Sequence, residues 1–194
     1  MIWQAKPRRA IIQSQAEQGE HTPSRWLIFA DRQGVGKTNA PLLEKQGHSC
    51  FLVYAGNTDL TDQHIGSINP SHLTDFEGLF EKMRDTEAAP IRGIIHLWSL
   101  DSVLPDQLNT ATLEQAQTVG AYSALYLVQT LIKQPVLTPA QIGLVTQNVV
   151  PLTGRDQTAL NLAQSPLWGL GKVIALEQPE IWGGLIDLEL IPSG

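Results

Sequence analysis

The sequence has 194 residues, of which 42% are hydrophobic and 16% charged, and its formal net charge is −6. A chain of this length can bury roughly 70% of its unfolded surface, so it can fold as one domain without cross-links. The negative charge and the absence of a Lys/Arg cluster exclude a nucleic-acid binder and a protein held on an anionic membrane surface. Because no targeting segment and no apolar run of bilayer-spanning length is present, we expect a cytoplasmic protein that makes no membrane contact.

The chain begins with a polar lead-in and continues as an alternation of strands and helices. We interpret residues 1–24 as an N-terminal strand and linker, and residues 25–194 as one domain. Near-continuous apolar runs predict buried strands at residues 26–29, 51–54, 94–98, 142–145 and 184–188. Helical patterns separate them at residues 39–46, 72–84, 112–133 and 166–177. This alternation predicts a Rossmann-like α/β fold of three layers with a mainly parallel sheet.

The last predicted helix has the clearest boundaries. Ser165 is a predicted N-cap, and Pro166 takes the first helical position, where its missing N–H costs nothing. Gln178 and Pro179 end the helix.

The segment after the first strand lies where an α/β fold binds phosphate. Gly36-Lys37-Thr38 matches the end of a Walker-type loop, which is the basis of a P-loop-like nucleotide-binding alternative. That loop also needs a glycine where Asp31 stands. A carboxylate at about 4 Å from a phosphate is repelled by up to ~4 kcal/mol at an effective dielectric constant of about 20. We therefore interpret the three residues as the start of a helix.

Gly34 and Gly36 also match part of a dinucleotide-binding turn. The third glycine of the Rossmann pattern is replaced by Asn39, and Phe29 and Ala30 stand where a short-chain reductase has Thr and Gly. We expect the two glycines to keep the turn between strand and helix tight. The turn is degenerate, and no residue is predicted to bind a cofactor.

The catalytic residues of a short-chain reductase are not found. That chemistry uses a tyrosine with a lysine four residues later, and none of the tyrosines (Tyr54, Tyr122, Tyr126) has one there. The last helix instead carries Trp168 four residues before Lys172. An indole N–H cannot shuttle a proton at neutral pH. We hypothesise that Trp168 overlays the lost tyrosine, and we predict no catalytic residue.

Other chemistry-bearing residues are scattered. Asp59, Asp62 and His64 crowd one loop and could ligate a metal, but a solvated acidic loop is the commoner case, so no metal site is predicted. His96 lies in a predicted strand, where a hydrogen-bonded core histidine is more common than a catalytic base. Cys50, the only cysteine, opens an apolar run and is expected to be a buried, unreactive thiol.

The run from Trp168 to Leu188 resembles a hallmark of polyketide synthase ketoreductase domains, in their N-terminal structural subdomain. Weaker matches lie at residues 26–31, 34–36, 68–70, 75–76, 93–101, 114–117 and 123–125, and together they cover nearly the whole chain. The chain is therefore identified as similar to the structural subdomain of a modular type I polyketide synthase ketoreductase, excised from a longer polypeptide.

This resemblance implies a fold, a role and partners. In the family, the ketoreductase consists of two halves that resemble short-chain dehydrogenases/reductases. The first half is truncated and binds no cofactor, and the second carries NADPH and a Ser-Tyr-Lys set. The implied partners are the catalytic subdomain and other domains of the same polypeptide, with an acyl carrier protein delivering the substrate. The same half also occurs as a pseudo-ketoreductase beside a C-methyltransferase domain. The alternative is a stand-alone NADPH-dependent short-chain reductase.

The predicted helix at residues 112–133 has two apolar stripes. One consists of Leu113, Ala116, Val119, Leu127 and Leu131, and the second consists of Tyr122, Leu125, Tyr126 and Ile132. A helix that is apolar on more than one side must be covered on more than one side. Either both stripes are buried within this domain, or the second one docks on the catalytic half. We favour docking, because the family has that interface.

Overall fold

The structure is a computed structural model that describes residues 23–60, 64–84, 89–134, 140–151 and 160–189. Six strands form one sheet in the order β3-β2-β1-β4-β5-β6, and each neighbouring pair is parallel. The strands are β1 (Arg25–Phe29), β2 (Ser49–Ala55), β3 (Ile65–Ile68), β4 (Ile91–His96), β5 (Gln141–Gln147) and β6 (Trp182–Leu188). This is the strand order of the Rossmann fold, whose ligand crevice lies where the order reverses beside β1.

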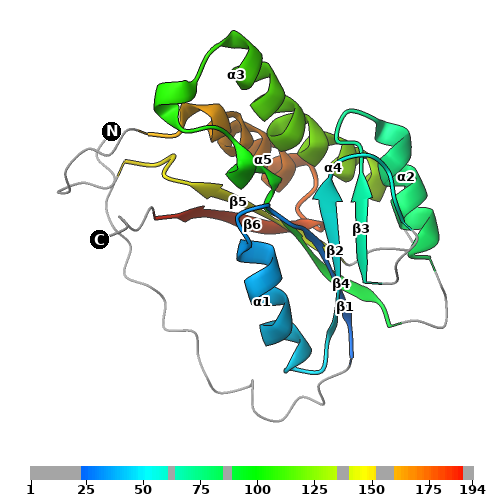
Figure 1. Ribbon diagram of the computed structural model, residues 1–194. Coiled ribbons are helices and arrows are strands. Elements are labelled where there is room, and N and C mark those ends of the chain that lie inside the picture. The colour runs from blue at the N-terminus through cyan, green and yellow to red at the C-terminus, as the bar shows by residue number, and fades with distance from the viewer. Residues whose placement is uncertain (1–22, 61–63, 85–88, 135–139, 152–159, 190–194) are drawn as a thin grey trace.

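Helices cover both faces of the sheet unequally (Figure 1). Helix α1 (Val35–Glu44) lies on one face. On the other face lie α2 (Leu73–Lys82), α3 (Thr110–Gln117), α4 (Ser123–Lys133) and α5 (Pro166–Glu177). The larger apolar cluster fills the space under the four helices, and the smaller one lies under α1. The predicted three-layer Rossmann-like fold is confirmed.

The strand predictions hold in position, with one omission and one early stop. The predicted burial is wrong for β6, which lies at the edge of the sheet and has no buried residue. All five predicted strands are present, but β4 ends at His96, because the chain then enters a 3₁₀ turn (Trp98–Asp101). Strand β3 is absent from the prediction, since its four residues include Gly66 and Ser67 and give only a short apolar signal. Gly66 belongs there because a Cβ would come within 2.9 Å of the Leu60 side chain.

The helix predicted at residues 112–133 is divided into three parts. Helix α3 begins at Thr110, because Asn109 caps it: the Asn109 side chain accepts the Thr112 N–H at 3.1 Å, and Thr112 Oγ1 accepts the Asn109 N–H at 2.9 Å. A π-helical turn (Thr118–Tyr122) then separates α3 from α4. Such a turn inserts an extra residue and changes which side chains share a face.

The other helix boundaries differ in detail. Helix α5 spans the predicted residues, with Ser165 at the N-cap position and Pro166 at the first helical position, as predicted, but the Ser165 side chain makes no capping hydrogen bond. A 3₁₀ turn (Leu162–Gln164) precedes the helix, and the Ser165 hydroxyl donates to the Leu162 carbonyl at 2.8 Å. Helix α2 is shorter than predicted by one residue at its start and two at its end, and α1 lies at residues 35–44 rather than 39–46. Of the helices in the described part of the chain, none has the length and apolar character that a membrane crossing requires.

Candidate functional site

The first turn of α1 is capped by a buried carboxylate from the loop that follows β1. Asp31 is 1% exposed, and its two oxygens accept the backbone N–H groups of Val35, at 3.0 Å, and Gly36, at 2.8 Å. These are donors that a helix N-terminus would otherwise offer to an anion. This cap explains why α1 begins four residues earlier than the sequence pattern indicates.

The two glycines of the turn have structural reasons to be there. Gly34 has φ +95°, the left-handed backbone that favours glycine. At Gly36 a Cβ would come within 3.0 Å of Leu97 and 3.1 Å of Ala30 and Ile28, so the residue permits close packing of α1 on the sheet. The prediction that these glycines keep the turn tight agrees with this geometry.

Beside this turn, a cavity of about 100 Å³ opens between the end of β2, the 3₁₀ turn that follows β4, and helix α3. Arg32 and Asp101 lie on its wall. The Arg32 guanidinium donates to the Ala55 carbonyl at the end of β2, at 3.2 Å, and the Arg32 N–H donates to Asp101 at 2.8 Å. Burial raises the pKa of Asp101. Sites for drug-sized ligands and cofactors usually measure about 300–1,000 Å³, so this cavity accepts only a much smaller molecule.

A second cluster of hydrogen-bonded polar side chains lies near the ends of β5 and β6. The Trp168 indole N–H donates to Thr146 Oγ1 at 3.1 Å, and the Thr146 hydroxyl donates to Asp187 at 2.7 Å. Asp187 also accepts the N–H groups of Val149 and Val150, both at about 3 Å. The sequence analysis missed Thr146 and Asp187, although a carboxylate in the apolar run 184–188 was a signal of a buried partner.

Apolar side chains are exposed along the outer face of α4 and the end of the π-helical turn before it, and together they are called the α4 stripe. Tyr122, the last residue of that turn, is 54% exposed, and Leu125 and Ile132 of α4 are 37% and 48% exposed. With the exposed Gln129, these positions are spaced i, i+3, i+7 and i+10, which places them on one side of a helix. Three of the four predicted interface residues are therefore exposed, and no contact among the described residues buries them.

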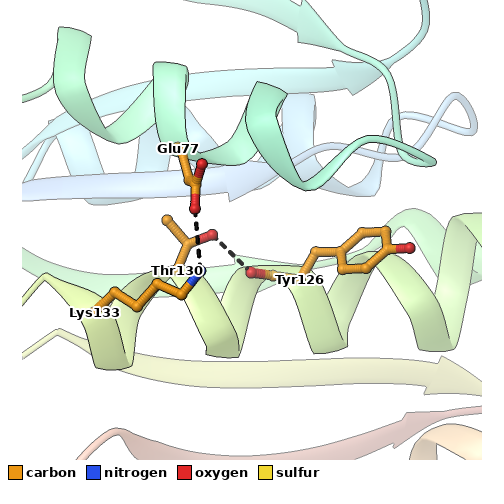
Figure 2. A network of polar contacts seen from close by, with 4 residues as sticks. All are labelled: Glu77, Tyr126, Thr130 and Lys133. Atoms are coloured by element: carbon orange, nitrogen blue, oxygen red, sulfur yellow. Dashed lines mark hydrogen bonds and ion pairs between the residues drawn. The ribbon is translucent and has the colours of Figure 1, made fainter.

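Tyr126, the fourth predicted interface residue, is half-buried. Its ring packs at an angle of 63° on Phe76 of α2, with 6.0 Å between ring centres. Figure 2 shows it on the α2 side of α4, with its carbonyl accepting the Thr130 hydroxyl at 2.8 Å and Lys133 paired with Glu77 at 3.2 Å. Tyr126 thus helps to join α4 to α2, and a substitution there would disturb packing as well as any interface.

Helix α5 carries a second exposed stripe, which the sequence analysis missed. Pro166, Gly169, Val173 and Leu176 are exposed and have the same i, i+3, i+7, i+10 spacing. Val173 is 48% exposed and Leu176 82%. The helix lies on the same side of the sheet as α4 and packs beside the π-helical turn that leads into α4 (Figure 1).

Comparison with known proteins identifies the family. Residues 27–153 match the family described as Beta-ketoacyl synthase-like, N-terminal. The chain belongs to this family. The predicted relation to the structural subdomain of polyketide synthase ketoreductases is confirmed at this level.

Two relatives of this beta-ketoacyl synthase-like subdomain are polyketide synthases. It is 31% identical over 135 residues to a phenolphthiocerol/phthiocerol polyketide synthase of Mycobacterium tuberculosis, covering 66% of this chain and 8% of that protein. It is 45% identical over 71 residues to the pikromycin polyketide synthase component PikAII of Streptomyces venezuelae, covering 37% of this chain and 2% of that protein. The chain therefore spans less than a tenth of the length of these relatives.

Solved structures agree on the fold of the subdomain. A multidomain structure with a ketoreductase, from a keto acid-selecting NRPS module, matches with a TM-score of 0.77 and 23% identity, over 88% of this chain and 14% of that one. A C2-type ketoreductase from a modular polyketide synthase matches with a TM-score of 0.60 and 23% identity, over 86% of this chain and 33% of that one. A short-chain dehydrogenase/reductase from Saccharomyces cerevisiae matches with a TM-score of 0.63 and 10% identity, over 87% of this chain and 71% of that one.

The subdomain's crevice does not fit the NADPH that the reductase fold implies. The Asp31 carboxylate holds two of the N–H groups that would meet a pyrophosphate. Trp168 lies on α5, and its indole N–H donates to Thr146, near the end of β5. Whether Trp168 overlays a lost tyrosine stays a hypothesis.

Two other residues that could carry chemistry, His96 and Cys50, are buried in the core. His96 is fully buried, its Nε2 lies 2.9 Å from Ser123 Oγ, and burial lowers its pKa to about 3. It is a core histidine, as predicted. Cys50 is buried, and burial raises its thiol pKa to about 11, which leaves it unreactive at neutral pH. Asp62, a member of the predicted acidic loop, lies outside the described residues, as does the lead-in up to residue 22.

Proposed function

We propose that this chain is the non-catalytic structural subdomain of a polyketide synthase ketoreductase, and that it supports the NADPH-dependent catalytic subdomain of the same polypeptide by docking on it. The observation that carries the proposal is the exposed apolar stripe of α4, formed by Tyr122, Leu125 and Ile132. A connected exposed apolar surface is typical of a protein–protein contact. The second exposed stripe, on α5, extends the surface available for docking.

The size of the matched part supports a partner within the same polypeptide. The chain covers 33% of the C2-type ketoreductase, so most of that protein lies outside the region of similarity. A catalytic half supplied by that remainder would cover the α4 stripe, and an acyl carrier protein would deliver substrate to that half. In a pseudo-ketoreductase, a neighbouring C-methyltransferase domain would be the supported partner instead.

The absence of a reductase site in the described residues supports a role without chemistry. A stand-alone NADPH-dependent reductase needs a dinucleotide crevice and a Tyr–Lys pair, whereas here Asp31 fills the turn and Trp168 precedes Lys172. A P-loop-like enzyme needs a lysine aimed at phosphates, whereas Lys37 is exposed on α1 and Asp31 stands in the loop. Neither alternative gains support from the geometry.

Charge substitutions on α4 test the docking proposal. In the Leu125→Glu and Ile132→Glu variants, we expect the affinity for the separately purified catalytic subdomain to fall by about tenfold or more, because a carboxylate would be buried in the contact. The melting temperature should stay within about 2 °C of the unchanged chain, because both side chains are exposed. Calorimetric titration measures the first quantity and thermal unfolding the second.

Leu42→Glu is the matched control. Leu42 is 53% exposed and lies on α1, on the opposite face of the sheet. Its substitution should leave the affinity unchanged. Equal affinity of the unchanged chain and both α4 variants would remove the α4 stripe from the interface, and a loss of affinity in Leu42→Glu alone would move the docking surface to the α1 face.

A further inference from the structure

We propose that Asp31 is a built-in substitute for a cofactor phosphate at the N-terminus of α1. The inference goes beyond the proposed function, because it concerns what occupies the reductase-like crevice rather than what the outer helices dock on. It follows from a disagreement: the strand order and the glycine turn are those of a dinucleotide-binding fold, but the residues at the turn do not leave room for the dinucleotide.

The phosphate position is taken by a side chain with the same chemistry. In a dinucleotide-binding fold, the pyrophosphate lies at the N-terminus of the helix that follows the first strand, where it accepts backbone N–H groups. Here the two oxygens of Asp31 accept the N–H groups of Val35 and Gly36, the first two residues of that helix. The carboxylate is 1% exposed, so it is fixed in place rather than free to move aside. A second anion would meet a like charge and find two of its donors taken.

The residue after Asp31 ties the same loop to its neighbours. The Arg32 guanidinium donates to the Ala55 carbonyl, at the end of β2, at 3.2 Å. The backbone N–H of Arg32 donates to Asp101, in the 3₁₀ turn after β4, at 2.8 Å. These contacts hold the loop between β1 and α1 that carries Asp31.

A reductase completes the contact between an anion and its helix N–H groups only when the cofactor binds. Here the same contact is made by the chain itself, without a ligand. The helix N-terminus has its anion at all times, because the anion is covalently part of the chain. The first turn of α1 is therefore stabilised in the absence of NADPH, and added NADPH or pyrophosphate gains nothing by binding there.

Removal of the carboxylate tests the proposal. The unchanged chain should show no change in melting temperature with inorganic pyrophosphate or with NADPH, at an ionic strength held constant with sodium chloride. The Asp31→Ala variant should melt about 2–8 °C lower, as expected when a helix loses its cap. Pyrophosphate should then raise the melting temperature of this variant by about 2 °C or more, because the vacated N–H groups are free to bind an anion.

Two further variants keep the test decisive. Asp31→Asn removes the charge but keeps one oxygen acceptor, so it should fold even if Asp31→Ala does not, with a smaller loss of melting temperature and a measurable response to pyrophosphate. Asp106→Ala, an exposed aspartate in the 3₁₀ turn Pro105–Gln107, should match the unchanged chain in both measurements. The proposal is overturned if the unchanged chain is stabilised by pyrophosphate or NADPH, or if neither Asp31 variant responds to pyrophosphate. These results do not depend on whether the α4 stripe docks.

Discussion

His96 lies at the centre of an aromatic cluster and carries no charge there. Its ring centre lies 5.5 Å from that of Phe29 and 5.6 Å from that of Trp98, and it has no measurable exposure. Its described polar contact is the Ser123 hydroxyl. Burial therefore lowers its pKa from 6.5 to about 3. A residue type that often marks catalysis is here a neutral part of the core.

This buried histidine should make the free energy of unfolding depend on pH. Below pH 6.5 the unfolded chain binds a proton on this imidazole, while the folded chain does not do so until about pH 3. The unfolded state then holds more protons than the folded state. The contribution of His96 to the free energy of unfolding is therefore complete above pH 6.5. It falls as the pH is lowered towards 3, by up to about 1.4 kcal/mol per pH unit. Urea unfolding over this range measures the slope.

The His96→Phe variant separates this slope from that of other groups. Phenylalanine keeps an aromatic ring beside Phe29 and Trp98, and Ser123 keeps its contacts with the Val119 and Gly120 carbonyls. We expect a shallower dependence of stability on pH in this variant. The same slope in both proteins would contradict a neutral, buried His96.

At the scale of elements, Asp187 connects strand β6 with β5 and the chain that leaves β5. It accepts the Thr146 hydroxyl of β5 and the N–H groups of Val149 and Val150, while Thr146 accepts the indole of Trp168 on α5. One carboxylate therefore accepts hydrogen bonds from β5 and from the chain that follows it. The run of residues 168–188, which resembles a hallmark of polyketide synthase ketoreductases, contains both ends of this network, Trp168 and Asp187.

Removal of this carboxylate should loosen the β5–β6 edge. We expect Asp187→Ala to lower the free energy of unfolding by about 1–3 kcal/mol, because partly buried N–H donors lose their acceptor. Asp187→Asn keeps one oxygen and should lose less. Chemical denaturation gives both values, and an unchanged stability in Asp187→Ala would show that water replaces the carboxylate without cost.

Individual elements differ in how far the sequence alone predicts them. The five longer strands are predictable, because strands covered on both faces need near-continuous apolar runs. Strand β3 is not, since its glycine reflects contact with Leu60, which only the folded chain defines. Asp31 and Asn39 show in the sequence that the turn is degenerate, but not that Asp31 caps the helix. The inward position of Tyr126 depends on where α2 places Phe76, and no helical spacing contains that information.

At the scale of the whole molecule, the two faces of the sheet differ in what they offer a partner. The α4 and α5 side exposes two apolar stripes. On the α1 side the exposed apolar residues include Pro41 and Leu42 on α1 and Ile186 on β6, the register partner of Val145 in the smaller cluster. The crevice whose helix N–H groups Asp31 accepts lies where the strand order reverses. The strand order of a dinucleotide-binding fold is thus present, and the proposed docking surface lies on the outer helices.

Radical footprinting of the complex can show which face docks. With the catalytic subdomain present, the oxidation rates of Tyr122 on α4 and Leu176 on α5 should fall about tenfold or more, as expected when a side chain passes from solvent to a dry interface core. Leu42 on α1 should keep its rate, because it lies across the sheet. Protection of Tyr122 without Leu176 would limit the contact to α4. Protection of Leu42 without Tyr122 would contradict docking through the outer helices and leave their apolar stripes without a partner.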